Sequence, residues 1–204
     1  PKKIEISLKY LEKGADIVYH DLFIAKKGAL KNNRKAKTRS LFSPIFNDLL
    51  VNGNALNTSS VVLQKNIFED VKLFSEEKKL IAIEDFDAWL KLSTITEKFV
   101  RIPQALGYYS VGIDNTSNPK KTLETIEIFL YRNKKKIDSL NLKNKISWVY
   151  YAKGRQNLIL ENFDIALEQF KKILFMDSFF IIKSKSFFFI ISIYIRKYLR
   201  IKLK

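Results

Sequence analysis

Residues 15–24, ADIVYHDLFI, combine apolar, aromatic and β-branched side chains and predict a β-strand. The residues just before them, 2–13, place Ile4, Leu8 and Leu11 on one face of a helix, and Gly14 is typical of a helix end. A helix that runs directly into a strand is the first indication of an α/β arrangement.

The chain continues to alternate between the two kinds of element as far as residue 111. A polar stretch rich in lysine and asparagine, residues 25–40, predicts a loop. Short helices are predicted over residues 41–51 and 84–92, and strands over residues 58–63, 99–102 and 105–111, the last two separated by Pro103. In the helix that starts at Glu84, an apolar side is formed by Phe86, Trp89 and Leu90. The alternation predicts an α/β layer fold.

From Asn118 onward the pattern becomes helical. Asn118 can cap free backbone donors, and Pro119 at the first helical position loses no hydrogen bond. A helical hairpin follows over residues 145–160 and 163–176. We therefore expect an α/β part over residues 1–117 and a helical extension over 118–204.

The hairpin has one feature of a tetratricopeptide repeat. Gly154, Ala166 and Phe170 fall at the spacing of the small and aromatic positions of that repeat. A single repeat cannot bury its own apolar face, so an ordinary hairpin docked on the α/β part is the favoured interpretation. A non-enzymatic helical module for protein interaction is the alternative.

The C-terminal segment is both apolar and basic. Residues 178–204 contain seven Lys or Arg and no acid, within a chain of net charge +16. The apolar stretch 179–195 is interrupted by Lys183 and Lys185 and is shorter than the ~20 residues of a spanning helix. It predicts a helix at an anionic bilayer surface, and therefore a peripheral location at the cytoplasmic face of a membrane. The alternative is that its aromatic face packs on another part of the protein.

Composition excludes several classes of site. The chain of 204 residues is long enough for one or two compact units, and it has no cysteine, so disulfides and thiolate chemistry are excluded. No Gly-rich phosphate loop, zinc spacing or Ser/His/Asp order is present. The tail and residues 26–39 each contain seven basic residues, but no interleaved basic and aromatic pattern of the single-strand-binding kind is present, so no nucleic-acid partner is expected. The single histidine, His20, is expected to be satisfied by a neighbour more often than to contact a substrate.

Three short passages carry a resemblance to a known family. They are residues 57–63 (NTSSVVL), 84–90 (EDFDAWL) and 102–111 (IPQALGYYSV). Taken together, and in this order and spacing, they resemble the family 2 glycosyltransferases. The opening residues 1–4 also resemble the stretch that follows the metal-binding Asp-x-Asp of that family. The resemblance covers about residues 1–118.

The resemblance implies the C-terminal half of a GT-A domain and an inverting sugar transfer from a nucleotide-sugar to a glycan or lipid-linked acceptor. Such a transfer needs a base for the acceptor hydroxyl and a cation for the departing diphosphate. The base would be Asp85. The acceptor and donor sugars would be held by Glu84, Thr58, Ser59, Ser60 and Trp89. Mg or Mn would bind mostly to carboxylates before residue 1, in a donor-binding half that we expect to precede this chain.

Two observations oppose this interpretation. Glu84, Asp85 and Asp87 could simply complement the dipole of a helix start. In addition, many family members have a basic residue and a histidine where this chain has Ser110 and Gly112. Asp114 or Asn115 would be the substitutes for these groups. An enzyme needs Asp85 to be exposed in an open cleft near residues 58–60, whereas a scaffold would leave Asp85 as the cap of a surface helix.

Overall fold

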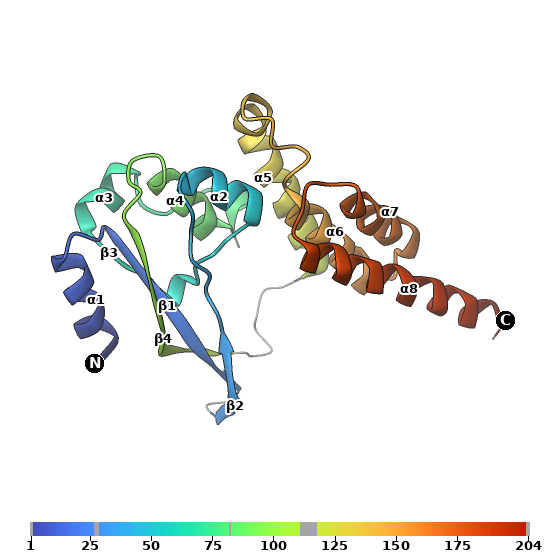
Figure 1. Ribbon diagram of the computed structural model, residues 1–204, viewed down its shortest axis with the longest axis horizontal. Coiled ribbons are helices and arrows are strands. Elements are labelled where there is room, and N and C mark those ends of the chain that lie inside the picture. The colour runs from blue at the N-terminus through green and yellow to red at the C-terminus, as the bar shows by residue number, and fades with distance from the viewer. Residues whose placement is uncertain (1, 27–28, 82, 111–117, 203–204) are drawn as a thin grey trace. The chain divides into compact units, whose positions relative to one another are not determined.

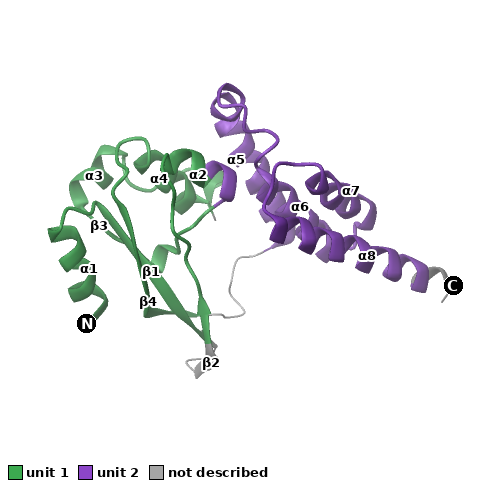
Figure 2. Ribbon diagram, viewed as in Figure 1, with its two compact units in different colours: residues 1–49, 54–116 green, residues 50–53, 117–204 purple. Residues whose placement is uncertain are grey.

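The computed structural model describes residues 2–26, 29–81, 83–110 and 118–202 (Figure 1). Their contacts divide the chain into two compact units (Figure 2). The first unit comprises Pro1–Leu49 and Asn54–Thr116, and the second comprises Leu50–Gly53 and Ser117–Lys204. The first is a mixed α/β structure and the second is helical, so the α/β class predicted for the first part of the chain is confirmed.

The sheet of the first unit is organised around β1 (Ile17–Lys26). Strand β4 (Phe99–Ser110) runs parallel to β1 and pairs with it from Ile17 to Ala25. Strands β3 (Val62–Leu63) and β2 (Ala29–Ala36) are antiparallel to β1 and pair with its beginning and its end, respectively. Because β4 accompanies β1 along nearly its whole length, β2 and β3 share the opposite edge of β1.

Helix α1 (Lys2–Glu12) lies beside β1 and β4 (Figure 1). It ends as predicted at Gly14, which has a φ of +97°. The amide of Gly14 donates to Leu11 O at 2.9 Å and that of Ala15 donates to Tyr10 O at 3.1 Å, the two bonds of a Schellman motif. Tyr10 and Leu11 then pack on a buried cluster that includes Val18. The helix and the strand are thus joined by a rigid turn.

The prediction of a loop over residues 25–40 is wrong, because β2 occupies part of that range. Its register places Lys35 opposite Phe23, and the Lys35 ammonium lies 5.5 Å from the Phe23 ring centre. Strand β2 pairs with β1 through its backbone. Lysine is common on such edge strands because its charge opposes further pairing.

Two other strand predictions need correction. Residues 58–63 are not one strand, since Thr58–Ser60 form a single 3-10 turn and only Val62 and Leu63 join the sheet. Residues 99–102 and 105–111 are not separate strands, since β4 is continuous from Phe99 to Ser110. The register against β1 shifts where Pro103 occurs, from His20↔Ile102 to Asp21↔Ala105. A bulge accommodates a proline that cannot donate to the ladder.

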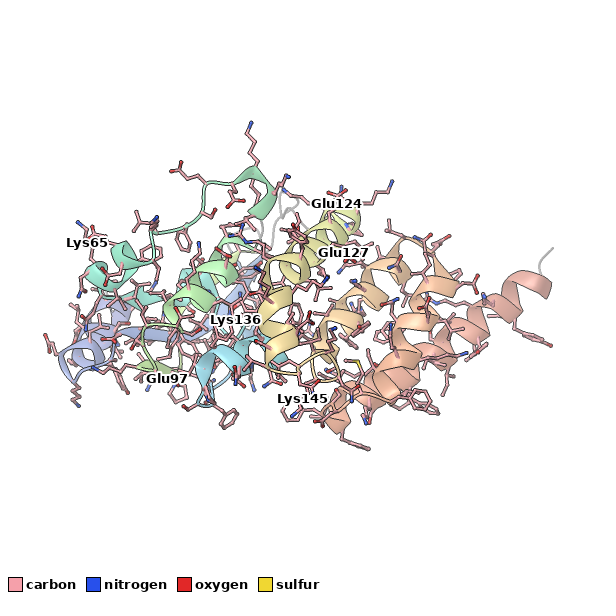
Figure 3. The ribbon with its side chains drawn as sticks, turned by 90° about the horizontal axis from the view of Figure 1, so that it is seen from above. Lys65, Glu97, Glu124, Glu127, Lys136 and Lys145 are labelled. Carbon is pink, nitrogen blue, oxygen red and sulfur yellow. The ribbon has the colours of Figure 1, made fainter. Side chains whose placement is uncertain are left out.

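Three α-helices complete the first unit. They are α2 (Ile45–Asn52), whose last residues belong to the second unit, α3 (Lys65–Asp70) and α4 (Glu84–Leu92). The amide at the start of α2, from Ile45, donates to the carboxylate of Glu97 at 3.1 Å (Glu97 is labelled in Figure 3). Helix α4 has the predicted bounds and buries Phe86 and Leu90.

A buried ionic network joins β1 to β4 and to the residues after β2. Asp21 accepts hydrogen bonds from the amide of Thr38 at 2.9 Å, from Thr38 Oγ1 at 2.8 Å and from Arg101 at 3.0 Å. Arg101 Nε also donates to Thr38 Oγ1 at 3.0 Å. Burial raises the pKa of Asp21, but the bonds from Thr38 and Arg101 outweigh it and leave the pKa lowered. The network fixes the middle of the sheet.

The second unit contains four helices among the described residues: α5 (Pro119–Ser139), α6 (Ser147–Ile159), α7 (Phe163–Leu174) and α8 (Phe180–Lys202). The Asn118 side chain accepts from the Lys120 amide at 2.9 Å, so the predicted cap is confirmed. Helices α6 and α7 form the predicted hairpin, in which a Cβ on Gly154 would lie 2.8 Å from the Phe170 ring. Among the described residues, no helix has both the length and the apolar character needed to cross a membrane.

Candidate functional site

The structure brings together Thr58 and Asp85, which are separated by 27 residues in the sequence. Thr58 lies in the 3-10 turn before β3, and its Oγ1 donates to Asp85 Oδ2 at 2.6 Å. Asp85 lies in the first turn of α4. The contact joins two of the three passages that carry polar residues, and Thr58 is exposed, so the pair lies at the surface of the first unit.

Asp85 has two further hydrogen-bond donors. Its Oδ1 accepts from the amide of Phe86 at 2.6 Å, and the Asn54 side chain also donates to the carboxylate. Burial raises the pKa of Asp85, the bonds from Thr58, Phe86 and Asn54 lower it, and the negative charge of Glu84 raises it. The net effect is a raised pKa. A carboxylate in this state holds a proton more readily than an exposed one.

The other predicted polar residues lie near this pair but in different environments. Ser59 is exposed, and its carbonyl accepts from Lys3 Nζ at 2.9 Å. Ser60 is fully buried, and its hydroxyl donates to Asn57 O at 2.6 Å. Glu84 precedes Asp85 at the start of α4 and is half-buried. Ser59 is thus accessible to a ligand in this chain, whereas the Ser60 side chain contributes to the turn itself.

Trp89 belongs to the core of the first unit. Its side chain is 1% exposed, and its ring meets the Phe74 ring edge-on at 5.9 Å between centres. The indole nitrogen is buried and has no hydrogen-bond partner in the part of the chain that the structure describes. The expected contact between Trp89 and a sugar stays a prediction. In the structure, the Trp89 side chain anchors α4 in the core by packing against Phe74.

His20 is also buried. Its Nδ1 lies 2.7 Å from the carbonyl oxygen of Asp21, so the ring donates there when Nδ1 carries the proton. Burial lowers the pKa of His20, which keeps the ring neutral. A histidine bonded to its own neighbour is the structural role that the sequence favoured.

Two residues near Asp85 were not predicted. Asn54 follows Gly53, which has a φ of +77°, in the turn after α2, and Lys3 reaches the Thr58–Ser60 turn from α1. The only available signal was the Gly-Asn pair, which is typical of a turn but does not indicate a ligand. No local sequence pattern predicts the contact between Lys3 and Ser59, because the two residues are 56 positions apart.

Over the described ranges, no three histidine or acidic side chains are placed to hold a metal ion. Ser110 ends β4 and is exposed. Gly112, Asp114 and Asn115 lie outside the described residues.

No family model, no curated protein and no solved structure matches the chain. The function of the chain is therefore inferred from the residues around Asp85 and from the motifs that they form.

Proposed function

We propose that this chain is the C-terminal part of an inverting glycosyltransferase of the GT-A type. It would transfer a sugar from a nucleotide-sugar to a glycan or lipid-linked acceptor, in the synthesis of a surface polysaccharide or glycoconjugate. The single observation that supports this most strongly is the 2.6 Å hydrogen bond between Thr58 and Asp85. The enzyme interpretation requires these two passages to meet.

Asp85 would act as the general base. In a single displacement, the acceptor oxygen forms a bond to the anomeric carbon, the bond to the nucleotide diphosphate breaks, and the acceptor proton passes to Asp85. A raised pKa favours this step because proton transfer is most effective when the pKa of the base approaches the working pH. Thr58 and Asn54 hold the carboxylate in one orientation, and Glu84 would bind the acceptor.

Mg or Mn would be held mainly by carboxylates that precede residue 1. Such a cation neutralises the charge that develops on the departing diphosphate. The contact between Lys3 Nζ and Ser59 O places the start of α1 next to the Thr58–Ser60 turn. An Asp-x-Asp immediately before α1 would therefore lie close to Thr58 and Asp85.

A second candidate is a non-enzymatic interaction module. Two observations favour it, and the first is that Asp85 Oδ1 accepts from the Phe86 amide, as a group that complements a helix start would. The close contact of Gly154 with Phe170 also gives α6 and α7 one feature of a repeat used for protein binding.

The proposed location is the cytoplasmic face of a membrane, without insertion of a spanning helix. The seven positive charges of residues 178–204 support it, since each basic residue near an anionic surface contributes about 1 kcal/mol of binding. No nucleic acid is proposed as a partner.

The decisive experiment replaces Asp85 by Asn in a chain to which an upstream donor-binding half has been joined. Asp85→Asn keeps the size of the side chain and an oxygen that accepts from Thr58, but it removes the base. Turnover of a nucleotide-sugar is expected to fall by about 10²–10⁴-fold while the fold is retained. Asp87→Asn is the matched control, because Asp87 pairs with Lys91 at 2.7 Å within α4. Its turnover should stay within a few-fold of the original.

Near-normal turnover of both variants would refute the assignment and leave Asp85 as a helix-capping group. Residues 1–204 without the upstream half are expected to bind no UDP-sugar in calorimetry with Mn. Saturable binding there would place the donor site within this chain and contradict the proposed division of the enzyme.

A further inference from the structure

Helix α8 has an inner face that is fixed to its own unit. Ile190 and Ile193 are buried in a cluster with residues of α7, and the Phe189 ring stacks on that of Phe170 at 5.0 Å. Near the C-terminal end, Lys197 forms an ion pair with Asp164 of α7. The rotation of α8 about its own axis is therefore determined by these contacts.

The outer face of α8 is apolar and exposed. At 3.6 residues per turn, its large apolar side chains cover roughly half of the helix circumference. Between Phe180 and Leu199, the polar residues within this sector are Ser184 and Ser192. The exposed fractions of the apolar side chains range from 41% to 82%. They are Phe180, Ile181, Phe187, Phe188, Ile191, Tyr194, Ile195, Tyr198 and Leu199.

Basic residues border this apolar face on both sides. Lys183 lies along one border, and Lys185 and Arg196 lie along the other, by their helical positions. No acidic residue occurs anywhere in residues 178–204. The outer face thus combines a broad apolar strip with margins of a single sign of charge.

This combination decides between three possible occupants. A second copy of the chain would bring two basic margins together, and like charges repel. A protein surface would have to remove the bordering cations from water and supply acids for them. An anionic bilayer suits both the apolar strip and its basic margins, because acyl chains accept the apolar side chains while phosphates pair with Lys and Arg.

We propose that the outer face of α8 is a membrane-insertion surface, which places its aromatic and aliphatic side chains at the headgroup and acyl boundary of an anionic bilayer. The inference rests on the proposed membrane location and deepens it by naming the face of α8 that enters the bilayer, and it does not depend on the sugar transfer. Binding then has two components, an apolar one from the outer face and an electrostatic one from its margins. Salt should weaken the binding without abolishing it, since apolar burial is insensitive to screening.

The test is sedimentation of the full chain with vesicles of phosphatidylcholine alone or mixed with phosphatidylglycerol. One variant carries Phe188→Ser, Ile191→Ser and Ile195→Ser. Its control carries Tyr131→Ser and Ile159→Ser, which change exposed apolar residues on α5 and α6. We expect the first variant to bind mixed vesicles more weakly by at least about 100-fold, from the lost apolar burial, and the control to bind as the original does.

A second pair of variants tests the margins at equal net charge. Lys183→Gln, Lys185→Gln and Arg196→Gln remove three charges from α8, and Lys120→Gln, Lys134→Gln and Lys135→Gln remove three exposed charges from α5. The α8 variant should lose about fivefold in affinity for mixed vesicles for each cation removed, and the α5 variant much less. Equal losses would mean that net charge alone matters, and would overturn the assignment of the margins.

Direct evidence of insertion comes from Phe188→Trp with lipids brominated on their acyl chains. Quenching of the new tryptophan beyond that of Trp89 and Trp148 supports the proposal. Absence of extra quenching, or unchanged vesicle binding by the serine variant, overturns it. A dimer in light scattering without lipid that the serine variant loses would assign the face to a second copy instead. Far-ultraviolet circular dichroism confirms that each variant is folded.

Discussion

The replacement of Gly154 by Ala gives a sharp test of the packing between α6 and α7. In an open helix this change stabilises by about 1 kcal/mol, because glycine is a poor helix former. At this position the added Cβ would lie 2.8 Å from Cε1 and Cζ of Phe170 and 3.1 Å from Cδ1. The distance is far below a normal carbon contact, so the ring or the helix must move.

The ring of Phe170 has little room to move. It is fully buried, stacked on Phe189 at 5.0 Å and met edge-on by Tyr151 at 6.0 Å. Overpacking in such a core costs about 1–3 kcal/mol. Subtracting the helix-propensity gain, we expect Gly154→Ala to lower the free energy of unfolding of the second unit by about 1 kcal/mol.

Urea unfolding followed by tryptophan fluorescence measures this change. A Trp89→Phe background leaves Trp148 as the one emitter, and Trp148 reports on the second unit because it contacts Phe129 and donates to Leu50 O at 2.8 Å. In a further Phe170→Leu background the clash is relieved, so Gly154→Ala should there become neutral or stabilising. A Gly154→Ala variant that is stabilised while Phe170 is present would refute the reasoning.

Three other changes test the first unit and the start of the second. The folded pKa of Asp85 is raised from 3.8, so its ionisation opposes folding and wild-type stability should decline as pH rises from 3.8 through the folded pKa. Asp85→Asn should remove this decline, which urea midpoints measured at about pH 4 and pH 7 would show. The folded pKa of Asp21 is lowered, so its contribution is complete above 3.8 and is lost as pH falls through the folded value. Asp21→Asn should therefore cost about 2–3 kcal/mol at neutral pH, by leaving Arg101 without its carboxylate, and much less in acid; an equal cost at both pH values would contradict the ionic role. Asn118→Ala removes the bond to the Lys120 amide and should destabilise α5 by about 1 kcal/mol, with faster amide exchange confined to its first turn.

The parts of the fold that sequence predicts are those with local signals. Helix α4 follows from its apolar spacing, the turn at Gly14 from a residue that tolerates positive φ, and the start of α5 from Asn118 and Pro119. Strand β2 could not be predicted because its polar residues form a strand only through pairing with β1. The continuity of β4 across Pro103 depends on a bulge, which is a property of the pair of strands.

The candidate site was predictable only in part. The meeting of Thr58 and Asp85 was expected from the resemblance, since no rule of spacing joins residues so far apart. Asn54 and Lys3 contact the site through tertiary structure alone. Trp89 received two competing predictions, one as a sugar contact and one as part of the apolar side of α4. The observed burial agrees with the second, because helical periodicity is a physical constraint whatever the function of the helix.

Helix α8 is already ordered by its inner face before any partner meets its outer face. Most short amphipathic segments are disordered in water and lose conformational entropy when they adsorb, which weakens their binding. In α8 that entropy is lost during folding of the second unit, so binding should be fast and insensitive to helix-promoting solvents. Because α8 is fixed in this orientation, its apolar outer face stays exposed to water whenever no partner covers it. Heterologous expression should therefore yield aggregates that mild detergent or added vesicles disperse.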